Sequence, residues 1–265
     1  MVAKQFFNGC HGKMSYVKIE GKKDFPTIIF MDGFGGASNY LGLKNIAKRI
    51  DTRYPKLFID RLGVCESDET DVERTWENIV FEIHELIEHV EHSPIIFFAH
   101  SANGPLALAY QHAYSEEVLG IIGIEPTTKD GDFLFQTKAY KVAISWMDKL
   151  SPEERNQIFI DSEWTENEKL EEERTAKHIT EGSTLFNEYL MGQKNLQSIS
   201  QLPKNKNLPV LIFLQPFREN EYRCSEYAGN NTTYILLEGH HYLHRVHPDK
   251  IAKEVTRWLN YNVGY

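Results

Sequence analysis

The chain has 265 residues, of which 41% are apolar and 25% are charged, a balance typical of a folded globular protein and not of a disordered one. Its 29 basic and 38 acidic side chains give a net charge of −9, which argues against nonspecific binding to nucleic acid or to anionic membranes. No apolar run reaches the roughly 18 residues of a membrane span, and the N-terminus lacks the apolar core of a signal peptide. The three cysteines, an odd and sparse set, favour a reducing compartment. We therefore expect a cytoplasmic protein with no nucleic-acid partner and no membrane insertion.

The predicted elements begin with strands and then alternate between strands and helices. Polar segments at 5–8 and 14–20 predict a hairpin. Short apolar runs then predict buried strands, at 27–31, 56–60, 94–99, 119–124, 209–214 and 233–237. Apolar residues at helical spacing predict helices between them, at 43–50, 76–90, 105–113 and from Pro248 onward. This alternation predicts an α/β fold with a mostly parallel, mixed sheet flanked by helices.

One long region, at 129–205, interrupts the alternation and contains no strand pattern. An apolar stripe runs through 135–147, and Ser151 followed by proline has the pattern of a helix start. A charged helix at 163–173 and an amphipathic one at 183–199 follow. We expect a core domain made of 1–128 and 206–265, with 129–205 inserted as a helical cap.

The segment that indicates chemistry is a buried strand, then His100-Ser101-Ala102, then a helix. A serine on such a tight strand-to-helix turn presents its hydroxyl above the sheet, at a helix N-terminus. Crowding there requires small residues two positions before and after the serine. Ala99 meets this requirement, whereas Asn103 is larger than the usual glycine. Ser101 is therefore the candidate nucleophile.

At this point the chain resembles the α/β-hydrolase superfamily along essentially its whole length, including a helical cap before the last two core strands. Residues 29–36 resemble the oxyanion loop of that superfamily, 60–63 with 67–68 resemble the turn after its fourth strand, and 239–244 resemble its histidine loop. The resemblance implies that the backbone N–H groups of Phe34 and Ala102 form the oxyanion hole. Asp32 stands where the family usually has histidine, and a carboxylate is unfavourable there unless it is paired or turned away.

The resemblance also implies a histidine base and an acid. His241 is the expected base, because it lies seven residues before Pro248, as in the histidine loop of the family; His240 is the alternative. The acid usually follows the strand after the cap, where Glu219 fits with a one-residue shift. Its other location in the superfamily follows the strand before the cap, as in the haloalkane dehalogenases, and Glu125 stands there. We expect Glu125, with Glu219 as the alternative.

These residues predict a serine hydrolase of carboxylesterase type that cleaves a small or medium acyl ester through an acyl-enzyme. A serine nucleophile instead of an aspartate argues against dehalogenase and epoxide hydrolase chemistry in the same fold. Carbon–carbon bond hydrolysis, acyl transfer, a lyase reaction and a non-enzymatic small-molecule receptor remain as alternatives. We expect no cofactor and no metal, since the histidines at 240–247 lack a matching ligand motif.

Overall fold

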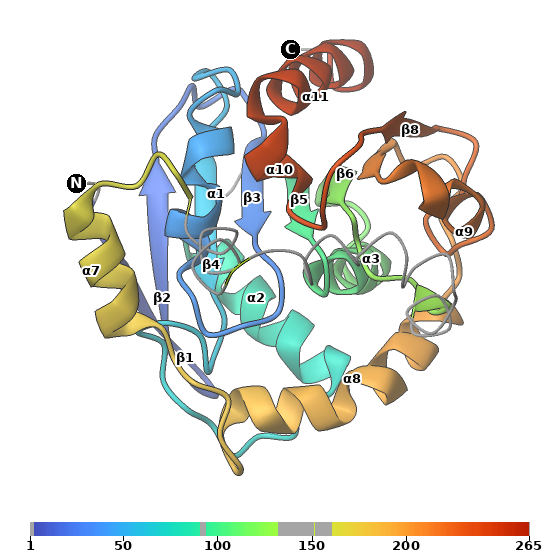
Figure 1. Cartoon of the computed structure of the whole chain (residues 1–265). Coiled ribbons are helices and arrows are strands. Elements are labelled where there is room, and N and C mark those ends of the chain that lie inside the picture. Colours follow the sequence, from blue (N-terminus) through green and yellow to red (C-terminus); the bar gives the residue numbers. More distant parts are fainter. Residues whose placement is uncertain (1–2, 91–93, 132–150, 152–160, 265) are drawn as a thin grey trace.

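The computed structural model describes residues 3–90, 94–131, 151 and 161–264 (Figure 1). Its centre is an eight-stranded sheet in the order β1-β2-β4-β3-β5-β6-β7-β8. The strands are β1 Gln5–Gly9, β2 Gly12–Ile19, β3 Thr27–Met31, β4 Lys56–Asp60, β5 Ile95–His100, β6 Val118–Ile124, β7 Val210–Leu214 and β8 Thr232–Leu236. Strand β2 is antiparallel to β1 and β4, and β3 to β8 are mutually parallel. The prediction of a mixed, mostly parallel sheet is confirmed.

Helices cover both faces of this sheet (Figure 1). They are α1 Asn39–Ala47, α2 Trp76–Val90, α3 Asn103–Ala113, α7 Glu166–Thr175, α8 Thr184–Ser200, α9 Glu219–Arg223, α10 Leu243–Val246 and α11 Pro248–Asn262. A short 3₁₀ turn, η2 (Pro216–Arg218), joins β7 to α9. Among the described residues, none of these helices has the length and apolar character needed to cross a bilayer.

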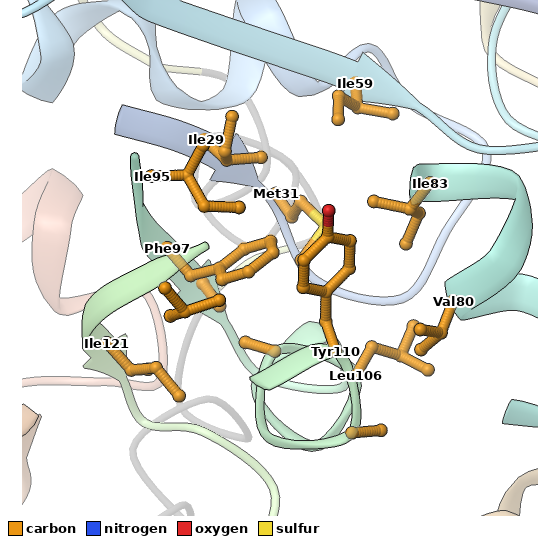
Figure 2. Packing of buried hydrophobic residues seen from close by; sticks show 14 of the residues in the cluster. Ile29, Met31, Ile59, Val80, Ile83, Ile95, Phe97, Leu106, Tyr110 and Ile121 are labelled. Atoms are coloured by element: carbon orange, nitrogen blue, oxygen red, sulfur yellow. The ribbon is translucent and has the colours of Figure 1, made fainter. Parts of the chain in front are cut away.

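The hydrophobic core lies in two layers, one on each face of the sheet. On one face, strand residues such as Ile29 and Phe97 pack against α2 and against Tyr110 of α3 (Figure 2). On the other, Phe30 and Phe98 pack against α1 and α11. The central strands are mostly apolar because both of their faces are buried. The rigid sheet fixes the positions of the loops at its carboxyl edge, where the chemistry is expected.

Two helices begin earlier than predicted. Helix α1 begins at Asn39 because Ser38 caps it, its hydroxyl accepting from the N–H of Leu41 at 3.5 Å. Helix α3 begins at Asn103, before Pro105. The apolar stripe at 135–147 and the helix after Ser151 lie outside the described residues, so the division into core and cap stays a prediction.

The charged segment that begins at Glu163 is attached to the rest of the fold by side-chain contacts. The Trp164 indole donates to the carbonyl of Leu41 at 2.9 Å. Glu168 of α7 pairs with Lys44, and Glu163 pairs with Arg49 at 2.5 Å. Acidic residues before and within α7 thus bind basic residues of α1 or just after it, which anchors α7 to α1.

Candidate active site

Ser101 stands on a strained turn between β5 and α3. Its φ is +53°, a left-handed conformation that is costly for any residue other than glycine. The turn is held from the neighbouring strand, since the N–H of Ser101 donates to Ile124 O at 3.1 Å and Thr127 N–H donates to Ser101 O at 2.9 Å. Gly104 is required for close packing, because a Cβ there would lie 2.3 Å from Pro126 Cβ. The predicted strand–turn–helix setting of Ser101 is therefore present.

His241 lies over Ser101, in the loop between β8 and α10. Its Nε2 is 2.8 Å from the Ser101 hydroxyl, a hydrogen-bond distance. His240, the alternative base, instead accepts from the backbone N–H of Tyr242 through its Nδ1 at 3.1 Å. The structure brings His241, of these two, to the serine.

Glu125 follows β6, the strand beside β5 in the sheet, so it shares the carboxyl edge with Ser101. It too is strained, with a φ of +44°. Its Oε2 lies 3.6 Å from His241 Nδ1, beyond a direct hydrogen bond but within ion-pair range. Glu219, the alternative acid, lies on α9 and pairs with Arg223 at 2.7 Å. The structure therefore places Glu125 beside the histidine and directs Glu219 to another partner.

A second set of contacts holds the Glu125 carboxylate. It accepts from the N–H of Gln215 at 2.6 Å and from Arg218 at 2.5 Å. Arg218 is itself buried and also pairs with Glu221 at 2.7 Å. Burial alone would raise the pKa of Glu125, but the Arg218 charge and the His241 contact hold it at about 2. Glu125 is thus a carboxylate throughout the neutral range.

The surroundings of His241 predict the pH dependence of any reaction that uses it as a base. Burial and the charge of His100 lower its pKa below the usual 6.5, against the opposing effect of Glu125. A base must be neutral, so activity falls as the pH drops through this pKa. We expect the acid limb of kcat/KM, measured from pH 4 to 9, to have its midpoint below 6.5. A midpoint above 6.5 would contradict this assignment.

The loop after β3 passes close to Ser101. A Cβ at Gly33 would lie 3.0 Å from His100 Nδ1 and 3.3 Å from Ser101 Cβ, so a larger residue there would require these side chains to move. Farther along the loop, Gly36 forms an isolated antiparallel bridge with Lys177, after α7. Gly36 O accepts from Cys65 N–H at 2.9 Å and from Lys177 N–H at 3.1 Å. The loop that carries Phe34 is therefore held from both sides.

The two departures from the family pattern, Asp32 and Asn103, contact each other. The Asn103 side-chain amide donates to the backbone carbonyl of Asp32. The Asp32 carboxylate accepts from Gly33 N–H and approaches His100 Nδ1, both at 2.7 Å. Burial raises its pKa, but the His100 contact outweighs burial and leaves the pKa well below its usual range. The condition that Asp32 be paired is met by His100.

Glu172 of α7 contacts the end of the loop between β3 and α1, and its surroundings predict that the stability of the fold depends on pH. Its carboxylate accepts from Ser38 N–H at 3.2 Å, and burial with the nearby Asp60 and Asp32 raises its pKa to about 7. Between pH 4.5 and 7 only the unfolded chain ionises this group, so folding loses stability as the pH rises. We expect Glu172→Gln to raise Tm at pH 8 by about 2–4 °C and to leave Tm unchanged at pH 4. Glu173→Gln, on the exposed side of α7, is the control; an equal gain at both pH values would contradict the assignment.

Several contacts of the site were not assigned from the sequence. His100 contacts Asp32, and Arg218 contacts Glu125. Neither His100 nor Arg218 had a role predicted from the sequence. Arg218 stands near the position where the resembled family usually has its acid. A basic residue at that position was a signal that the acid comes from elsewhere and pairs with it, as Glu125 does. The described residues contain no group of three or more His, Cys, Asp or Glu side chains arranged to hold a metal ion.

Solved structures share this fold. Smu.1393c from the cariogenic pathogen Streptococcus mutans matches with a TM-score of 0.75 at 23% identity, over 100% of both chains. A loop variant of the haloalkane dehalogenase DbeA from Bradyrhizobium elkanii matches at 0.73 and 17% identity, over 99% of this chain and 97% of that one. CarC, a serine hydrolase involved in carbazole degradation, matches at 0.65 and 14%, over 98% and 99%. No family model and no curated protein sequence matches the chain. The chain has the α/β-hydrolase fold, as the resemblance predicts.

Proposed function

We propose that this protein is a serine hydrolase that cleaves a small or medium acyl ester through an acyl-enzyme. The observation that carries the proposal is the 2.8 Å contact between His241 Nε2 and the hydroxyl of Ser101, on a strained turn at the N-terminus of α3. Glu125, a buried carboxylate 3.6 Å from the other ring nitrogen of His241, supplies the third member of a triad.

In the proposed mechanism His241 takes the hydroxyl proton as the Ser101 oxygen attacks the ester carbonyl. The N–H groups of Phe34 and Ala102 stabilise the oxyanion of the tetrahedral intermediate. The intermediate collapses to an acyl-serine, and the protonated His241 gives its proton to the leaving alcohol. Water, deprotonated by His241, then attacks the acyl-serine and releases the acid and the free serine. Glu125 keeps the Nδ1–H tautomer of His241 and stabilises its cationic form.

Two observations favour hydrolysis by serine over the alternatives in this fold. The residue on the turn is Ser101 and not an aspartate, which argues against the chemistry named for DbeA, whereas CarC is named as a serine hydrolase. Asp32 and Asn103 are the departures from the usual pattern that would support a receptor, and the side chains of both have partners within the loop network. Fold similarity alone does not select the substrate.

Turnover of activated esters tests the proposal. A series of p-nitrophenyl esters with acyl chains of rising length should give multiple turnovers, with kcat/KM highest for a short or medium chain. A non-enzymatic receptor would instead give at most one slow turnover, together with a ligand-dependent rise in Tm. If the protein only hydrolyses carbon–carbon bonds or only transfers acyl groups, the triad assignment would stand but ester hydrolysis would be excluded as its function.

A further inference from the structure

His100 connects the strand that leads to the candidate nucleophile with two neighbouring loops. It is the last residue of β5, directly precedes Ser101, and is 1% exposed. Its Nδ1 lies 2.7 Å from the carboxylate of Asp32, in the loop after β3. Its Nε2 lies 3.1 Å from the backbone carbonyl of His241, in the loop after β8. One imidazole ring thus contacts the oxyanion loop and the histidine loop at once.

The two partners of this ring can be compared by the hydrogen bonds that each can donate or accept. A backbone carbonyl, such as that of His241, only accepts hydrogen bonds. The Asp32 carboxylate also only accepts, and it already receives the Gly33 N–H at 2.7 Å. A neutral imidazole has one donor, so it would oppose a lone pair to one of these two oxygens. With Asp32 ionised, both contacts are satisfied together only when both ring nitrogens carry protons.

The groups around His100 are consistent with one buried ion pair, between His100 and Asp32. The rings of His241, His244 and Tyr242 lie 4.7, 4.9 and 5.1 Å from its ring, measured between centroids. Burial lowers the pKa of His244 far below its usual value, so that ring is neutral. The charge of Arg245 acts on Asp32 as well. A cation beside the N-terminus of α3 is unfavourable by itself, and Asp32 provides the compensating negative charge.

We propose that His100 is held as an imidazolium paired with Asp32, and that it is a positioning residue that fixes the oxyanion loop and the His241 loop relative to Ser101. Its effect on catalysis rests on the proposed hydrolase function, but its protonation does not. The pair explains why Asp32 is tolerated in the oxyanion loop: its charge is neutralised by His100, and its Oδ1 accepts from Gly33, the residue before Phe34.

The protonation is tested by nitrogen-15 NMR of the histidine rings at pH 7.5, with the His100 signals identified by their loss in His100→Gln. We expect both ring nitrogens of His100 to carry protons in the wild-type protein. In Asp32→Asn, whose amide can still accept from Gly33, we expect one of the two protons to be lost. A neutral His100 ring in the wild-type protein would overturn the proposal, whether or not the protein is an enzyme.

The positioning role is tested by kinetics of His100→Gln on an ester that the wild type turns over. Loss of the link misplaces the reacting groups, so kcat should fall by about 10–100-fold with little change in KM. Removal of the cation next to His241 should also move the acid limb of kcat/KM to higher pH. His11→Gln is the matched control, because His11 contacts a carboxylate in the same way, Glu82 Oε1 at 2.9 Å, and lies in the turn between β1 and β2.

The outcomes separate this inference from the proposed function. A folded His100→Gln protein with unchanged kcat and an unmoved acid limb would show that His100 does not position the site. If the wild type turns over no ester, the proposed function fails, and the NMR result still decides the protonation of His100. If His100→Gln does not fold, the His100 signals are identified by their change in Asp32→Asn, which then also provides the kinetic comparison.

Discussion

Ser101→Ala is expected to abolish ester turnover while the fold is retained. The substitution removes the nucleophile, and in serine hydrolases with a triad such a loss costs on the order of 10⁶-fold in kcat. The side chain is small and only partly buried, so its truncation leaves no large cavity. Burst and steady-state release of p-nitrophenol, with circular dichroism as the check on folding, measures the effect. Residual turnover above about 1% of wild type would show that another residue performs the chemistry.

Ser101→Gly is a matched variant that separates the strain at this position from its chemistry. Glycine adopts the φ of +53° without the steric cost that alanine pays. Both variants should be inactive, but Ser101→Gly should be more stable than Ser101→Ala by about 1 kcal/mol, or about 2–4 °C in Tm. Equal stabilities in thermal unfolding would show that the turn relaxes when the hydroxyl is removed.

Glu125→Gln has the second largest expected effect, a fall in kcat of about 10³–10⁴-fold. The neutral amide no longer stabilises the cationic His241 and no longer selects its Nδ1–H tautomer. The same substitution also removes one partner of the buried Arg218, so the protein should lose stability as well. Kinetics therefore has to be measured at a temperature where the variant is folded.

Two control variants isolate the catalytic part of the Glu125 effect. Glu221→Gln removes the other carboxylate paired with Arg218, at 2.7 Å, and should destabilise the protein without a comparable loss of kcat. Glu219→Gln removes the alternative acid, which pairs with Arg223, and should change kcat little. A large fall in kcat with Glu219→Gln and none with Glu125→Gln would contradict the choice of acid.

The sheet was predictable from the sequence because its central strands are buried on both faces. The run 28–31 is continuously apolar and 57–59 forms the apolar centre of 56–60, and the structure has strands at 27–31 and 56–60, as predicted. The start of α1 was missed, because the signal was the capping Ser38 in a glycine-rich loop and not an apolar stripe. Short apolar runs thus located the core strands, and local capping chemistry decided a helix boundary.

The candidate site was only partly predictable. Ser101 was recognisable because its neighbours in sequence, a strand and a helix, create its setting. The choice between Glu125 and Glu219 depended on which residues surround His241 in space. Arg218, which holds the Glu125 carboxylate, lies 93 positions from Glu125 along the chain. The contact between Asp32 and His100 joins residues 68 positions apart through the adjacency of β3 and β5. Such contacts follow from strand order, which no local pattern encodes.

Fluorophosphonate labelling tests the central claim, an activated Ser101, most directly. The wild-type protein and Ser101→Ala would be incubated with the probe and examined by intact mass, followed by peptide mapping. We predict one adduct, on Ser101, in the wild-type protein, and none in the variant. A folded wild-type protein that forms no adduct, or forms one on another residue, would contradict the account.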